Sequence, residues 1–291
     1  MPLFGKRPIN SEAAAQAQSD QERLTRGGLP LKAELRLTEL AKSRRFFTSN
    51  LSVNELALAV AEGVRPLGQV MGSTVYHVGW QYTPMYASSE LTLISHAHTH
   101  ARQLALSRLQ QEARLLGAHG VIGVRLERKS YEWGANLIEF AASGTAVALA
   151  DQPVPEHPFV CALSGQEFYA LRRGGFFPVG FAFGTCTYYQ VASYTNQWAS
   201  QSWTSLELTD YTQALYTARH TAMTRLSAEA ERVHAEGVVG VTIEDNIRTY
   251  EVEGNTGSRR DLIVEFTALG TAIVESGPDT LGVDYGLPLG D

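Results

Sequence analysis

The chain has 291 residues, of which 44% are hydrophobic and 19% are charged. This composition excludes an intrinsically disordered chain, and the length favours two domains of ordinary size. No run approaches the roughly 18 apolar residues of a transmembrane helix, and residues 1–16 contain no apolar segment of the signal-peptide type. Two cysteines, Cys161 and Cys186, cannot form a disulfide framework. These features predict a cytoplasmic protein without membrane association.

The net charge of −6 is unevenly distributed along the chain. Residues 1–45 hold nine Lys and Arg against five Asp and Glu, a balance of +4, whereas the other 246 residues hold 15 against 25, a balance of −10. An acidic body disfavours nucleic-acid binding, which needs a basic face against the phosphates. The basic N-terminal arm could dock on an acidic partner or on a neighbouring copy, but a solvated, partly disordered arm is the simpler interpretation.

The body of the chain is a tandem duplication of one unit. Residues 101–124 align with residues 218–241 without a gap, and 12 of the 24 positions are identical. The other matching segments are residues 66–76 with 178–188 and residues 139–146 with 265–272. The matching segments keep their order along the chain. The offset between the two copies grows only where loops are expected, since loops tolerate insertions.

The duplication predicts the domain organisation. The expected parts are an N-terminal arm (1–45), a first unit (46–150), a Pro-rich linker (151–157), a second unit (158–276) and a C-terminal tail (277–291). Prolines in the linker favour an exposed, extended segment.

Both units are expected to contain the same elements in the same order. A short strand comes first, and a short helix follows it because Ser52 and Ser164 each precede a Glu by three residues, the spacing of a capping box. The remaining elements are a glycine-containing strand (66–78 and 178–191), a long helix (89–116 and 206–234) and a hairpin (120–127 with 137–149, and 237–244 with 262–274). The expected first strands are residues 46–49 and 159–162. We therefore predict an α+β fold of two tandem repeats, each a mostly antiparallel sheet with one long helix.

No familiar enzyme motif is present in the sequence. It lacks a phosphate-binding loop, a dinucleotide-binding glycine pattern, a nucleophile elbow and a His-Glu-x-x-His pair. We therefore predict a protein that is not an enzyme, with no catalytic residues and no cofactor-binding residues.

One cluster of histidines resembles a metal site. If residues 96–100 are helical, His96 and His100 lie one turn apart on the same face, as two ligands of zinc or another divalent metal require, and His98 points to the opposite side. The second unit carries Gln213, Leu215 and Thr217 at these positions. Solvated or interface histidines are the alternative interpretation.

The connection between the glycine-containing strand and the long helix is aromatic and nearly uncharged in both units. It contains Trp80 and Tyr82 in the first unit and Trp198 and Trp203 in the second. Such a composition is typical of the centre of a protein interface, so these four residues are candidate interface anchors. A loop that folds onto its own domain is the alternative.

The motifs of each unit carry a family resemblance. Residues 118–124 and 235–241 read Ala-x-Gly-Val-Ile/Val-Gly-Val, and Gly-Thr-Ala follows at residues 144–146 and 270–272. Each unit resembles the YbjQ-like family, which bears a heavy-metal-binding label, and the resemblance covers about three quarters of the chain. The family's Thr-rich first strand is absent here, which weakens any binding site built on that strand.

The resemblance implies self-assembly, because members of the family form five-fold rings. The leading hypothesis is therefore a non-enzymatic protein whose partner is itself, forming a pentamer-type ring or a closed shell (a protein cage) through its tandem units. The alternative is a heavy-metal-binding or metal-sensing module that uses His96 and His100.

Overall fold

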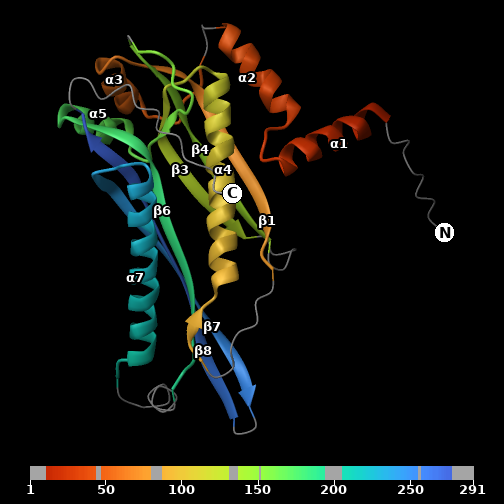
Figure 1. Cartoon of the computed structure of the whole chain (residues 1–291), viewed down its shortest axis with the longest axis vertical. Helices are drawn as coiled ribbons and strands as arrows, with labels where there is room; N and C mark the ends of the chain where they lie inside the picture. The colour runs from red at the N-terminus through yellow and green to blue at the C-terminus, as the bar shows by residue number, and fades with distance from the viewer. Residues whose placement is uncertain are drawn as a thin grey trace.

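The computed structural model describes residues 11–43, 47–79, 87–130, 137–150, 152–193, 205–254 and 257–276 (Figure 1). The N-terminal part and first unit contain α1 (Ser11–Thr25), α2 (Leu31–Ser43), α3 (Val53–Ala61), β1 (Val64–His77), β2 (Ser89–Glu90), α4 (Thr92–Leu115), β3 (Gly120–Ser130) and β4 (Leu137–Leu149). The second unit contains β5 (Phe159–Val160), α5 (Gly165–Arg173), β6 (Phe176–Gln190), α7 (Thr209–Arg232), β7 (Gly237–Gly254) and β8 (Gly257–Glu275). None of the described helices combines the length and apolarity needed to cross a membrane.

The α+β fold with two repeated units is confirmed, and even local irregularities recur. Both short helices begin with a capping box, at Ser52 and at Ser164. The pairing of β1 with β4 shifts register at Pro66, and the pairing of β6 with β8 shifts register at the corresponding Pro178. Each long helix lies within three residues of its predicted ends. Equivalent positions in the two units are called counterparts below.

Each long helix lies very close to one strand of its own unit. A Cβ atom added to Gly72 on β1 would lie 2.0 Å from the Ala105 carbonyl oxygen on α4, and one added to Gly184 on β6 would lie 2.0 Å from that of Ala222 on α7. Only glycine fits such a contact. In both units the long helix therefore packs directly against a glycine of the neighbouring strand.

The two sheets exchange strands between the units. The first sheet has the order β1-β4-β3-β5 and the second has the order β2-β6-β8-β7. The expected first strand of the second unit thus belongs to the sheet of the first, where Phe159 and Val160 pair in parallel with β3. Its expected counterpart at residues 46–49 is not a strand over the described residues 47–49. The strand that corresponds to β3, which is β7, belongs to the other sheet.

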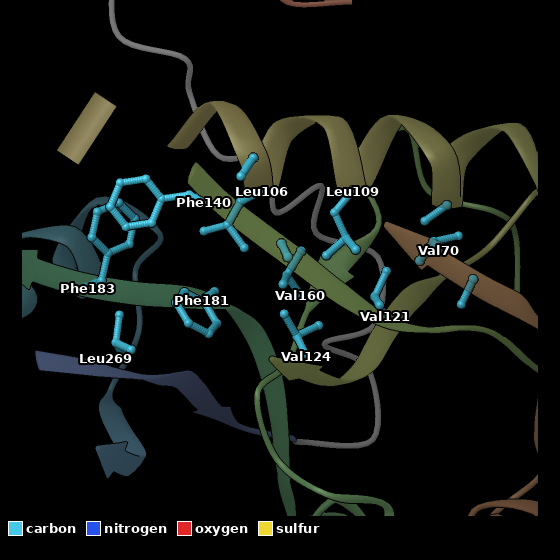
Figure 2. Close-up of a cluster of buried hydrophobic side chains, with 14 of the residues drawn as sticks. Val70, Leu106, Leu109, Val121, Val124, Phe140, Val160, Phe181, Phe183 and Leu269 are labelled. Carbon is cyan, nitrogen blue, oxygen red and sulfur yellow. The ribbon is translucent and has the colours of Figure 1, made fainter. Parts of the chain in front are cut away.

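The hydrophobic core is likewise shared. One cluster combines residues of α4, β3 and β4 with Phe181, Phe183 and Leu269 from the second sheet (Figure 2). A second cluster joins Ala59 and Ile122 of the first unit to residues of α5, β6 and α7. The two units therefore form one body rather than two separate domains.

The described part of the N-terminal arm is helical and lies on the first unit. Residues 11–43 form two helices, and α2 packs on α4 with Leu37 fully buried. The side chain of Arg36 approaches Glu112 at 3.4 Å, and Arg108 donates a hydrogen bond to the Leu24 carbonyl at 3.1 Å. Apolar residues at helical spacing, which the charge count does not register, hold the arm on the body.

Candidate assembly interface

The contact between the two units begins with a strand addition. The short strand β2 of the first unit pairs antiparallel with the edge of β6, with Ser89 opposite Tyr189 and Glu90 opposite Tyr188. The backbone N–H of Leu91 donates to the Thr187 carbonyl oxygen at 2.7 Å. This addition pairs the sheet edge at Tyr188 and Tyr189, where β6 would otherwise expose unpaired backbone groups.

A bidentate ion pair fixes this strand. Both terminal nitrogens of Arg225 on α7 donate to the Glu90 carboxylate, at 2.6 and 3.0 Å, and Arg225 also donates to the Thr185 carbonyl oxygen. Burial acts to raise the pKa of Glu90, but hydrogen bonds from Arg225 and Ser95 and the Arg225 charge outweigh it, so the pKa is lowered. The pair therefore stays ionised at neutral pH and links the two units.

A buried charged network lies further along the same contact. Arg102 of α4, 1% exposed, donates to the hydroxyls of Thr185 and Thr267 in the second sheet. Burial is the main reason that the pKa of Arg102 falls to about 10, so the guanidinium remains charged. Its charge is balanced by Glu265 of β8, which belongs to the same network.

Glu265 is the acidic centre of the network. One of its oxygens lies 2.8 Å from His98 Nδ1 and 2.5 Å from Arg128 Nη1, and both of these residues come from the first unit. Burial acts to raise the pKa of Glu265, but its contacts with His98 and Arg128 outweigh burial and lower the pKa to about 2. Removing one partner from such a group leaves a buried charge uncompensated, which is costly.

Strand β6 is buried on both faces because it runs between α7 and α4 (Figure 1). The sequence analysis missed this sandwiched position. The available signal was the near-continuous apolar run of residues 176–183, which favours a strand with two covered faces. Its counterpart β1 instead alternates buried and exposed residues.

The histidines of the predicted metal site are spread over different faces of α4. His98 is buried against Glu265, whereas His96 and His100 are exposed and His100 packs edge-on against Tyr76. Among the described residues, no three His, Cys, Asp or Glu side chains are grouped to hold a metal ion. The described donors therefore do not fit a closed site of the zinc type. The assignment of His96 and His100 as ligands stays a prediction.

The four aromatic anchor candidates cannot be placed. Trp80, Tyr82, Trp198 and Trp203 lie outside the described residues. Their assignment to an interface stays a prediction.

Comparison with known proteins finds relatives of two sizes. The chain is 38% identical over 256 residues to "Encapsulin nanocompartment protein Rv1762c" of Mycobacterium tuberculosis, which covers 86% of this chain and 94% of that protein. It is 40% identical over 90 residues to a UPF0145 protein of Clostridioides difficile, covering 29% of this chain and 79% of that protein. A UPF0145 protein of Thermus thermophilus is 36% identical over 110 residues, which cover 34% of this chain and 95% of that protein. No solved structure matches the chain.

The family assignment follows from two separate matches within the chain. The family model YbjQ_1, described as "Putative heavy-metal-binding", matches residues 62–150 and again residues 195–276. The two regions correspond to the two repeated units of the structure. This chain therefore belongs to the YbjQ-like family and carries its unit twice in tandem.

Proposed function

We propose that this chain is the subunit of a non-enzymatic homo-oligomer, a ring or a closed shell that copies of the chain build through their tandem units. The observation that carries the proposal is the joint between the two units, in which one family unit adds a strand to another and shares its core. A unit that binds a like unit in this head-to-tail manner has two different surfaces, and such heterologous contacts generate rings.

The relative named as an encapsulin nanocompartment protein supports the closed form of the assembly. The similarity spans 86% of this chain and 94% of that protein, so it extends over most of both units. We further propose that the contacts have five-fold symmetry, as the family resemblance implies. The cytoplasmic location remains part of this proposal as well.

Native mass spectrometry of the purified chain tests the proposal. We expect one dominant oligomer whose mass is a multiple of the chain and whose size does not change when a chelator is added. A distribution confined to monomers at micromolar concentration would remove the proposal, and a mass that requires zinc would favour the metal-sensing alternative.

A further inference from the structure

We infer that the contact between the two units within one chain is repeated between chains, with the second unit of one copy docking on the first unit of the next. This inference rests on the proposed function and specifies the contact. Its basis is that each surface used in the internal joint has a counterpart that is left open in the described part of the chain.

The first open surface is the outer edge of the first sheet. β1 ends the order of that sheet, whereas its counterpart β6 is covered by β2. Met71 is 54% exposed while its counterpart Phe183 is 3% exposed, and Val75 is 57% exposed while its counterpart Thr187 is 1% exposed. Apolar side chains on an uncovered strand edge are a liability unless another chain covers them.

The matching segment is residues 205–208, which precede α7. Its sequence, Ser-Leu-Glu-Leu, is the counterpart of Ser-Ser-Glu-Leu at residues 88–91, which contains β2. In the structure residues 205–208 belong to no strand, and Leu206 and Glu207 are exposed. The Glu207 carboxylate accepts a hydrogen bond from Thr212 at 2.8 Å, as Glu90 does from Ser95 in the internal joint. Residues 205–208 therefore have the sequence and the exposure needed to pair with a strand edge, as β2 does in the internal joint.

The ion pair of the joint also has an open counterpart. Arg108 on α4 corresponds to Arg225, and it donates to the Ser73 carbonyl oxygen just as Arg225 donates to Thr185. Where Arg225 binds Glu90, however, Arg108 binds only backbone carbonyls, and its buried Nε has no hydrogen-bond partner among the described residues. We assign Glu207 of a neighbouring copy as the carboxylate that binds Arg108, displacing the Leu24 carbonyl.

The groove beside Arg108 fits the same occupant. It is lined by residues 71–75 of β1 and by Glu112 of α4, and on the arm side by Leu24, Leu29, Pro30 and Ala33. The counterpart groove over Gly184 is lined by Ser95, His96 and Thr99 of α4. The α7 residues at those three positions are Thr212, Gln213 and Tyr216. Tyr216 is a large, exposed aromatic side chain on α7 and would enter the groove of the next copy.

The opposite half of the contact is open as well. In the internal joint β5 covers the edge of β3, but β7, the counterpart of β3, ends the second sheet uncovered. Val124 on β3 is 4% exposed and its counterpart Val241 is 40% exposed. On the other side of the contact, Phe47 is exposed, whereas its counterpart Phe159 is buried. One docking event therefore covers both edges, with residues 205–208 on β1 and residues 47–49 of that next copy on β7.

The buried network repeats only in part. Arg102 and Glu265 correspond to Arg219 and Glu139, whereas His98 and Arg128 correspond to Leu215 and Asp245. The contact between chains therefore uses strand addition and the ion pair of Glu207 with Arg108, and it lacks the His98 and Arg128 contacts of the internal joint. Because each chain supplies two units, a ring closed by this contact contains an even number of units, so the five-fold form of the ring contains five chains and ten units.

Cysteine crosslinking tests the register directly. The pairing of Ser89 with Tyr189 places Leu206 opposite His77 of the next copy, so Leu206→Cys with His77→Cys in one chain should give a ladder of covalent oligomers with a short bismaleimide crosslinker. The native cysteines are buried, and burial raises both of their pKa values to about 12, so they add no background. Leu206→Cys with Val154→Cys is the matched control and should give no ladder. Absence of the ladder in particles that still assemble would overturn the inference.

A charge reversal tests the ion pair independently. Glu207→Lys should lower the assembled fraction about tenfold or more, whereas Glu231→Lys, the same charge change at an exposed site near the other end of α7, should leave it unchanged. Circular dichroism melting should be alike for both variants. If Glu207→Lys assembles as the parent does, the inference fails while the proposed function stands. If the parent itself does not assemble, both fail.

Discussion

Gly184 and Ala222 lie so close that a methyl group on Gly184 would sit 2.0 Å from the Ala222 carbonyl oxygen. Gly184→Ala must therefore push α7 away from β6 and disturb a core that both units share. We expect it to lower the free energy of unfolding by about 3 kcal/mol or more, measured by urea denaturation.

The same test applies to Gly72, whose added Cβ would meet Ala105 at the same distance. Gly79 is the matched control, since a Cβ there meets nothing within 4 Å. If Gly184→Ala is as stable as Gly79→Ala, the close packing of helix on strand is wrong.

The lowered pKa of Glu265 predicts how stability depends on pH. The folded-state pKa, about 2, lies below the ordinary 4.5, so its charge stabilises the fold above pH 4.5 and this contribution is lost as pH falls toward 2. The contribution corresponds to ~3 kcal/mol. Glu265→Gln should be less stable than the parent at pH 7 and nearly equal to it at pH 2.

Thermal melting across that pH range measures this difference. Glu231→Gln, at an exposed site on α7, is the control and should follow the parent. A parallel pH profile for Glu265→Gln and the parent would contradict the charged network as described.

The metal hypothesis has its own measurement. Among the described residues no third donor joins the two histidines, and two histidines alone bind zinc weakly, so we expect elemental analysis of the dialysed protein to find well under one equivalent. The double variant His96→Ala and His100→Ala should then match the parent in metal content and in oligomer size. One equivalent of zinc that the double variant loses would instead support the metal-sensing alternative.

The tryptophan prediction distinguishes interface from core. If Trp198 and Trp203 are interface anchors, changing both to Ala should lower the oligomer size and leave the melting of the dissociated chain intact. If they pack on their own unit, the change should cost ~3–5 kcal/mol of stability per tryptophan. Sedimentation and melting of this one double variant separate the two results.

Sequence patterns predicted the repeated helices and strands, but they did not predict which strands pair or which buried side chains meet. Capping boxes at Ser52 and Ser164 and the repeated glycines are local signals, so helices and strands could be predicted from short windows. The transfer of β5 into the first sheet depends on which edge is uncovered in three dimensions, and no local pattern records that. Likewise, Arg102 and Glu265 are 163 positions apart, so their buried contact is visible only in the fold.

The most direct test of the account is the size and outline of the purified chain by light scattering combined with negative-stain microscopy. The account predicts closed particles of many copies, with the same diameter in the presence and absence of a chelator. A single species with the mass of one chain, under conditions in which the protein is folded by circular dichroism, would contradict it.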